Sequence, residues 1–178
     1  MRKTILGLLL PLLLLAGCAN EEAALDPTDD PTQSVAPAAT VQECEDRTPP
    51  APATEDEPGD TKPEIEIADG APPCELVIQD IHVGDGAEAQ EGATVTVHYV
   101  GVGWSTQEQF DASWDRDEPA TFPLDQVVEG WQEGIPGMKE GGRRQLIIPP
   151  DLAYGAMGRP GIAPNETLVF VIDLISAG

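Results

Sequence analysis

The most constraining feature of this sequence is a short helix signal at residues 127–134, Val-Val-Glu-Gly-Trp-Gln-Glu-Gly. Val127, Val128 and Trp131 recur at the spacing of one helix face, and Gly134 followed by Pro136 ends such a helix within about two turns. A helix this short is marginal alone in water, so a sheet must cover its apolar face. We therefore predict an α+β domain in which an antiparallel sheet curls around one short helix.

Alternating apolar residues predict the strands of this sheet, at residues 75–83, 94–102, 143–149 and 168–175. Within the second run, Val95, Val97 and Tyr99 share one face. Glycine turns between most of these runs favour antiparallel pairing. Residues 150–165 are rich in Gly and Pro and have no periodicity. A loop this long inside a small domain is usually functional.

The first 18 residues have the pattern of a secretory signal. Arg2 and Lys3 precede an apolar run, residues 4–15, that is too short to cross a hydrocarbon core of about 30 Å. The run ends in Leu-Ala-Gly-Cys, which resembles a bacterial lipoprotein signal with Cys18 as the acylated first residue of the mature chain. With two or more acyl chains, Cys18 would anchor the protein to the extracytoplasmic face of a bacterial cell membrane. A simple cleaved signal with a chance cysteine is the alternative.

Residues 19–70 are acidic, rich in proline and poor in residues that could form a core. Burial cannot then offset the entropy of ordering, so we predict a disordered tether between membrane and domain. A cation-binding segment is the alternative, although its carboxylates lack regular ligand spacing. The net charge of −23 disfavours nucleic acid and anionic membrane surfaces as partners. The lipid is therefore the expected membrane contact.

Once Cys18 is assigned to lipid, Cys44 and Cys74 remain. On the oxidising side of a membrane we predict that they form a disulfide, which would join the end of the tether to the first strand of the domain. Two free thiols or a metal site are the alternatives. We expect no metal, because neither His82 nor His98 stands in ligand spacing.

Residues 71–178 have the length and composition of one compact domain, and they carry a series of linked motifs. The motifs are residues 97–101 (VHYVG), 110–113 (FDAS), 130–134 (GWQEG), 138–142 (MKEGG), 148–155 (IPPDLAYG) and 164–170 (PNETLVF). Together they resemble the FKBP-type peptidyl-prolyl cis-trans isomerases over about residues 74–176. The resemblance implies a sheet of five or six antiparallel strands around one short helix. It also implies catalysis of X–Pro bond rotation without a cofactor, and the secretory signal makes exported proteins the expected substrates.

The resemblance further implies a proline-binding pocket in which Asp111, Tyr154 and Phe110 are catalytic. The substrate-binding residues that it implies are Tyr99, Phe122, Val127, Val128, Trp131, Ile162, Phe170 and Arg116. Trp131 would form the floor, and Arg116 would pair with Asp111. The Tyr154 hydroxyl and the backbone N–H of Ile162 would donate hydrogen bonds to substrate carbonyls.

The predicted chemistry needs no nucleophile and no metal. Rotation about X–Pro is slow because resonance holds the amide planar, with a barrier of roughly 18–20 kcal/mol. A dry aromatic slot should tolerate a twisted imide better than a planar one. A non-catalytic module that binds proline peptides in the same groove is the alternative function. Macrolide inhibitors are a further class of expected ligand, bound more weakly because Ala120 stands where the family often has an aromatic rim residue. We expect a monomer.

Overall fold

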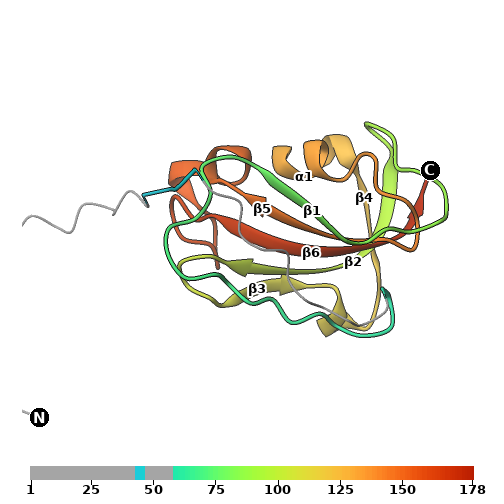
Figure 1. The fold of residues 1–178 in the computed structure, drawn as a ribbon, viewed down its shortest axis with the longest axis horizontal. Coiled ribbons are helices and arrows are strands. Elements are labelled where there is room, and N and C mark those ends of the chain that lie inside the picture. The colour runs from blue at the N-terminus through green and yellow to red at the C-terminus, as the bar shows by residue number, and fades with distance from the viewer. Residues whose placement is uncertain (1–42, 47–57) are drawn as a thin grey trace, which may run out of the picture. The chain divides into compact units, whose positions relative to one another are not determined.

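An antiparallel sheet and one short helix form the frame of the molecule (Figure 1), in a computed structural model that describes residues 43–46 and 58–178. The strands are β1 (Val77–His82), β2 (Thr94–Gly103), β3 (Gln109–Ala112), β4 (Ala120–Pro123), β5 (Arg143–Ile148) and β6 (Leu168–Ala177). The helix α1 spans Glu129–Gly134. The predicted fold class is confirmed.

The sheet has the order β1-β5-β6-β2-β3, and β4 also pairs with β2. Both β3 and β4 lie along the same strand: β4 pairs with residues 94–97 of β2, and β3 pairs with residues 100–102. Sequence periodicity did not predict either strand. Each has 4 residues, which is too short for an alternating pattern to stand out from its surroundings.

Helix α1 packs closely on β5 because glycines face the sheet. A Cβ atom on Gly130 would lie 2.4 Å from Ile148 Cγ2, and one on Gly134 would lie 2.6 Å from Leu146 Cδ2. This pair of glycines, four residues apart, gives the helix a bare face that a larger side chain would fill. The helix can therefore bring Trp131 down onto the sheet.

The predicted start of the helix is wrong by two residues. Val127 and Val128 have extended backbone, with ψ values of 176° and 148°, and Val128 is the N-cap residue. Its carbonyl accepts hydrogen bonds from the backbone N–H groups of Trp131 and Gln132, at 2.9 and 3.2 Å. β-Branched residues are restricted at χ1 in a helix, which favours the extended conformation here. Both valines still reach the site described below.

The inner face of the sheet carries the main core. Val95, Val97 and Tyr99 of β2 are buried against Trp131 in one cluster, as the alternation predicted. The odd-numbered residue Val169 of β6 lies instead in a second cluster, on the outer face. The two faces are therefore distinct, and α1 covers the inner one (Figure 1).

Residues 58–70, which we call the N-terminal strap, cross the outer face on the side away from α1 (Figure 1). Ile65 and Ile67 pack against both outer clusters, and the Trp104 indole N–H donates to the Gly70 carbonyl at 3.1 Å. The predicted tether boundary at residue 70 therefore falls after a segment that already packs on the domain. Composition concealed the strap because glutamates alternate with its isoleucines.

A buried ion pair fastens the strap to the sheet. Arg143 on β5 donates to Asp173 on β6 through Nε at 2.5 Å and Nη2 at 2.7 Å, and both side chains are almost fully buried. The backbone N–H of Gly59 donates to Asp173 Oδ2 at 2.8 Å, and the Thr61 carbonyl accepts from Arg143 at 3.2 Å. Backbone groups of the strap thus complete the hydrogen bonding of the buried charges.

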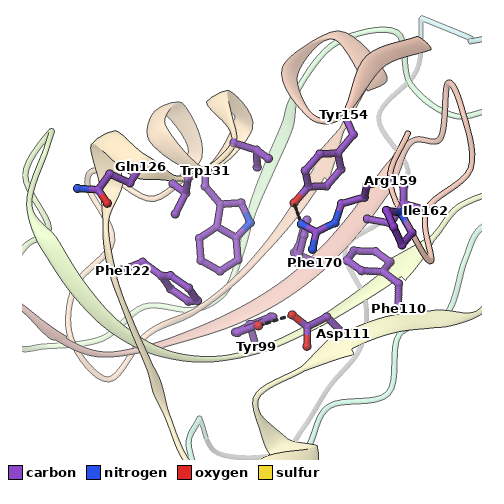
Figure 2. Close-up of a pocket in the computed structure, with 13 residues that line it drawn as sticks. Tyr99, Phe110, Asp111, Phe122, Gln126, Trp131, Tyr154, Arg159, Ile162 and Phe170 are labelled. Carbon is purple, nitrogen blue, oxygen red and sulfur yellow. Dashed lines mark hydrogen bonds between the residues drawn. The ribbon is translucent and has the colours of Figure 1, made fainter. Parts of the chain in front are cut away.

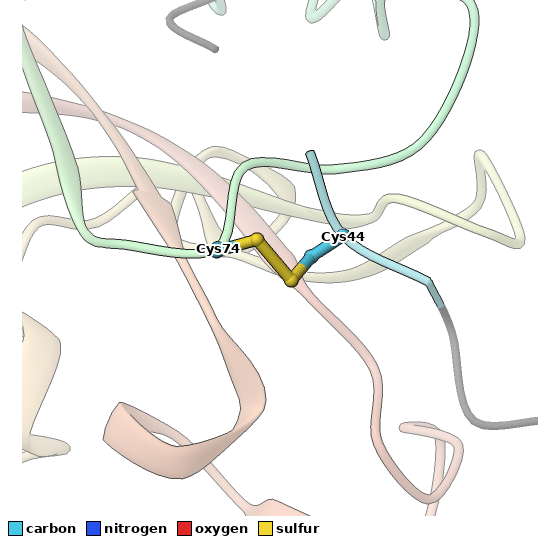
Figure 3. The surroundings of a disulfide bond; sticks show 2 residues. All are labelled: Cys44 and Cys74. Atoms are coloured by element: carbon cyan, nitrogen blue, oxygen red, sulfur yellow. A yellow bond between two sulfur atoms is a disulfide. The ribbon is translucent and has the colours of Figure 1, made fainter. Parts of the chain in front are cut away.

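Cys44 and Cys74 form a disulfide across a sequence separation of 30 residues (Figure 3). Residues 43–46 lie beside the segment before β1, where the Glu45 N–H donates to the Pro72 carbonyl at 2.7 Å. The predicted signal, the acylated Cys18 and most of the predicted tether lie outside the described residues. Within residues 43–46 and 58–178, no helix has the length and apolar character needed to span a bilayer.

Candidate active site

A cavity of about 590 Å³ opens between α1, the inner face of the sheet and the loop at residues 150–165 (Figure 2). The side chains that line it are Tyr99, Phe110, Asp111, Phe122, Gln126, Val127, Val128, Trp131, Tyr154, Arg159, Pro160, Ile162 and Phe170. The structure thus brings together every predicted pocket residue except Arg116, which contacts Asp111 but does not line the cavity. Because most of the lining is aromatic or aliphatic, the cavity suits a small apolar ring.

Trp131 hangs from α1 into the centre of an aromatic cluster (Figure 2). Its ring lies edge-to-face with Tyr99, Phe122 and Phe170, at centroid distances of 5.5, 5.6 and 5.3 Å. Edge-to-face packing is the preferred geometry of such rings and fixes their orientation. Only 4% of the Trp131 surface is exposed, so neighbouring side chains hold this ring in place at the floor of the cavity.

A β-bulge turns both Phe110 and Asp111 towards the cavity. The register between β2 and β3 shifts after Gly101, which pairs with Asp111, while Val102 pairs with Gln109. Phe110 therefore has no partner in the ladder, and the usual alternation of side chains between faces is broken. Its ring packs edge-to-face on Phe170 at 5.5 Å. Without the bulge, only one of these adjacent side chains could face the site.

Asp111 is held by two donors. The Tyr99 hydroxyl donates to Oδ2 at 2.5 Å, and Arg116 Nη1 donates to Oδ1 at 2.8 Å. Arg116 Nη2 also donates to the Tyr99 hydroxyl oxygen at 3.0 Å, which closes a ring of three residues. Arg116 comes from the 3-10 helix η1 (Trp114–Arg116) and does not line the cavity itself.

This ring sets the protonation states of its members. Partial burial opposes ionisation of Asp111, but the hydrogen bonds from Tyr99 and Arg116 outweigh it and hold the pKa of this carboxyl below its usual range. Burial, followed by the hydrogen bond to Asp111, raises the pKa of Tyr99 from 10.0 to about 12. At neutral pH the site therefore holds a fixed carboxylate and a neutral phenol. The Tyr99 hydroxyl has no donor left for a ligand, because its one proton is used.

Tyr154 offers the free hydroxyl donor of the cavity. It stands between the 3-10 helices η3 (Pro150–Leu152) and η4 (Gly155–Met157) of the long loop. Arg159 Nη1 donates to its hydroxyl oxygen at 2.9 Å (Figure 2), so the oxygen acts as acceptor and its own proton is available. A hydroxyl that accepts from a cation is polarised and becomes a stronger donor.

The prediction that the backbone N–H of Ile162 is a donor for substrate is wrong. That N–H donates to the Arg159 carbonyl at 2.8 Å, and the Arg159 N–H donates back to the Ile162 carbonyl at 3.0 Å. The loop closes a tight turn on itself here, and sequence alone does not show this pairing. Val128 lines the opposite wall, and its backbone N–H has no hydrogen-bond partner among the described residues.

Gln126, Arg159 and Pro160 also line the cavity and were not predicted. The unusually long loop was the available signal for Arg159 and Pro160, but its lack of periodicity gave no side-chain directions. Within the described ranges, no group of His, Cys, Asp and Glu side chains has the arrangement of a metal site.

Comparison with known proteins agrees with this geometry. A model of the FKBP-type peptidyl-prolyl cis-trans isomerase family matches residues 86–175, about half of the chain. The chain is 60% identical over 116 residues to a probable FK506-binding protein of Corynebacterium glutamicum, covering 65% of this chain and 98% of that protein. It is 57% identical over 119 residues to an FK506-binding protein of Streptomyces anulatus, covering 65% of this chain and 96% of that protein.

A solved structure shares the fold. The crystal structure of FkpA from Escherichia coli superposes with a TM-score of 0.55 at 45% identity, covering 57% of this chain and 47% of the FkpA chain. The residues matched by the family model, 86–175, include α1 and all the residues that line the aromatic cavity. This chain belongs to the FKBP-type peptidyl-prolyl cis-trans isomerase family.

Proposed function

We propose that this isomerase accelerates X–Pro rotation in proteins exported across the cytoplasmic membrane, and that Cys18 anchors it there through lipid. The observation that carries the catalytic part is the aromatic cavity with one free hydroxyl donor, Tyr154, at its rim. The signal pattern of residues 1–18 supports the location.

The proline ring enters the cavity and lies on Trp131, enclosed by Phe122, Phe110 and Phe170. Water is excluded from the imide in the cavity. The planar form has more charge separation than the twisted form, so the loss of solvation costs the planar form more. The walls are fixed by edge-to-face packing before the substrate arrives, so no reorganisation accompanies rotation. A thousandfold acceleration requires about 4 kcal/mol of transition-state stabilisation.

Hydrogen bonds hold the chain on either side of the rotating bond. The Tyr154 hydroxyl donates to the carbonyl of the residue before proline. The backbone N–H of Val128, on the opposite wall, takes the role first predicted for Ile162 and donates to a carbonyl after proline. With the peptide held on both sides of the X–Pro bond, rotation about that bond is the main internal motion left to it. The Asp111 carboxylate, held by Tyr99 and Arg116, adds a fixed negative charge at the edge of the cavity.

The same cavity also takes a macrolide ligand. FK506 binding is named for both bacterial relatives described above. Ala120 stands where the family often has an aromatic rim residue, so we expect weaker binding than an aromatic residue would give. A competing macrolide should therefore inhibit turnover by occupying the space over Trp131.

Magnetisation-exchange NMR on a short Leu–Pro peptide tests the catalytic proposal without a coupling protease. We expect the full-length protein to raise the cis–trans exchange rate far above the spontaneous rate. Peptide binding with exchange left at the spontaneous rate would instead favour the non-catalytic binding module.

A cell-fractionation experiment tests the location. The wild-type chain should sediment with membranes and incorporate labelled fatty acid, whereas Cys18→Ser should do neither. Equal fatty-acid incorporation by both proteins would contradict the lipid anchor at Cys18.

A further inference from the structure

We propose that Arg159 is a specificity-determining residue that favours substrates with Asp or Glu immediately before the proline. This inference rests on the proposed isomerase function, because it concerns which X–Pro bonds the cavity accepts. Three features of the described residues support it: the charge balance of the cavity, the way in which Arg159 is held, and its distance from the Tyr154 hydroxyl.

Among the residues that the structure describes, Arg159 is a cation without a carboxylate partner. In the described part of the protein, carboxylates pair with Lys62, Arg116, Arg143 and Arg144. Arg159 forms no such pair there, although the net charge of the chain is −23. Asp111 is the carboxylate that lines the cavity, and its charge is already balanced by Arg116. The mouth of the cavity therefore presents one uncompensated positive charge.

The Arg159 side chain is also held in place. Its guanidinium carbon lies 5.0 Å from the centroid of the Tyr154 ring, and Nη1 donates to the Tyr154 hydroxyl at 2.9 Å. The reciprocal backbone hydrogen bonds between Arg159 and Ile162 fix the base of the side chain. Guanidinium carries five N–H donors, so most of them stay available for a carboxylate, which it can bind through two parallel hydrogen bonds.

The position of Arg159 places it within reach of the side chain of the residue before proline. That residue supplies the carbonyl that accepts from Tyr154, at a normal hydroxyl–carbonyl distance of about 2.8 Å. Since Arg159 Nη1 lies 2.9 Å from the same hydroxyl, the guanidinium and the carbonyl are no more than roughly 6 Å apart. The side chain of Asp or Glu, which branches from the adjacent Cα, spans such a distance. Gln has the same length as Glu but no charge, and it therefore isolates the contribution of charge.

The test compares peptides that differ only in Glu, Gln or Lys before proline, with kcat/KM measured by exchange NMR on the full chain. Arg159→Gln removes the proposed contact. Lys139→Gln makes the same change in net charge at an exposed lysine outside the cavity, so it controls for the long-range field of the protein. We expect the Glu-to-Gln preference to fall roughly three- to tenfold in Arg159→Gln and to be unchanged in Lys139→Gln. Arg159→Glu should shift the preference to Lys–Pro.

An identical Glu-to-Gln ratio in the wild type and Arg159→Gln would overturn the proposal, as would an equal loss in Lys139→Gln. The proposed function fails separately, if the wild type accelerates none of these peptides. In that case the dissociation constants of the same peptides, from chemical-shift titration, still decide whether Arg159 reads the charge before proline.

Discussion

The Tyr99 hydroxyl donates a hydrogen bond to Asp111 Oδ2 at 2.5 Å, and both residues line the aromatic cavity. Arg116 donates to both residues, so both carboxylate oxygens of Asp111 and the Tyr99 hydroxyl have a partner. Of the two tyrosines that line the cavity, Tyr154 is therefore the one whose hydroxyl proton remains available. The Tyr99 hydroxyl donates to the Asp111 carboxylate and holds it in place, while the Tyr99 ring forms part of the cavity wall.

The first prediction concerns the titration of Tyr99. In Tyr154→Phe, Tyr99 is the one remaining tyrosine, because the chain has 2. Tyrosinate absorbance should then titrate with a pKa of about 12 rather than 10.0. The added change Asp111→Asn should lower this pKa, since it weakens the hydrogen bond to the phenol. A titration near 10 in Tyr154→Phe, with the fold shown intact by tryptophan fluorescence, would contradict the described ring.

The pH dependence of stability follows from the same shifts. The folded state raises the pKa of Tyr99, so it keeps this proton while the unfolded chain loses it, and stability should fall as the pH rises from about 10 to about 12. Asp111 has a lowered pKa when folded, so its contribution is present above the pKa of the unfolded chain and is lost in acid. Turnover should be flat between these limits. Denaturant melts should show that the free energy of unfolding falls more steeply with pH above about 10 in the wild type than in Tyr99→Phe.

A second site variant tests the shape of the cavity without removing any ring. A Cβ atom on Gly101 would lie 2.6 Å from Phe110 Cζ and 2.8 Å from Phe170 Cε1. Gly101→Ala must therefore push these rings into the cavity or apart. We expect turnover on a Leu–Pro peptide to fall at least tenfold, which is about 1.4 kcal/mol. Gly178→Ala, just after β6 and outside the cavity, is the control for a general effect of glycine replacement, because a Cβ atom there meets no atom within 4 Å and the backbone is not left-handed. Normal turnover in Gly101→Ala would mean that the rings of Phe110 and Phe170 can shift without loss of activity, which would contradict a fixed cavity wall.

The buried ion pair of Arg143 and Asp173 predicts a large effect on stability. Asp173→Asn leaves the arginine charge buried and uncompensated, which should cost about 3–5 kcal/mol of unfolding free energy. Asp115→Asn removes the exposed pair with Lys62 and should change stability little. Urea denaturation of the two variants provides the comparison. Similar losses in both would show that burial does not set the energy of the pair.

The disulfide between Cys44 and Cys74 should stabilise the domain without affecting catalysis. Closing a loop of this length constrains the unfolded chain and contributes roughly 3–4 kcal/mol. Neither cysteine lines the aromatic cavity. We therefore expect Cys44→Ser to lower the denaturation midpoint while kcat/KM stays at the wild-type value. An unchanged midpoint would mean that the closed loop contributes little to stability.

Periodicity predicted the elements with long, regular patterns. The faces of β2 and the existence of α1 followed from residue spacing, because one buried side imposes its period on the sequence. The short strands β3 and β4 did not, and neither did the bulge that aims Phe110 inward. The strap was concealed because Glu64 and Glu66 alternate with Ile65 and Ile67. These features depend on tertiary contacts that a local pattern does not encode.

The site was predicted through family resemblance rather than spacing. Resemblance assigned Trp131 and Tyr154 to the same cavity, although they stand far apart in the sequence. It assigned the wrong donor at Ile162 and gave no contact for Arg159. Both depend on the turn that follows Gly158, which has a φ of 59°. A backbone conformation of this kind determines which N–H groups remain free, and it is read from structure.

The central claim is that fixed aromatic walls favour the twisted imide over the planar one. Exchange NMR and chemical-shift titration on Leu–Pro peptide, applied to the wild type, Phe110→Leu and Phe110→Ala, separate kcat from ground-state affinity. Stabilisation of the transition state predicts that kcat falls in Phe110→Ala by a much larger factor than affinity does. The kcat of Phe110→Leu should lie between those of the wild type and Phe110→Ala. Equal losses of kcat and affinity, or full turnover in Phe110→Ala, would contradict the account.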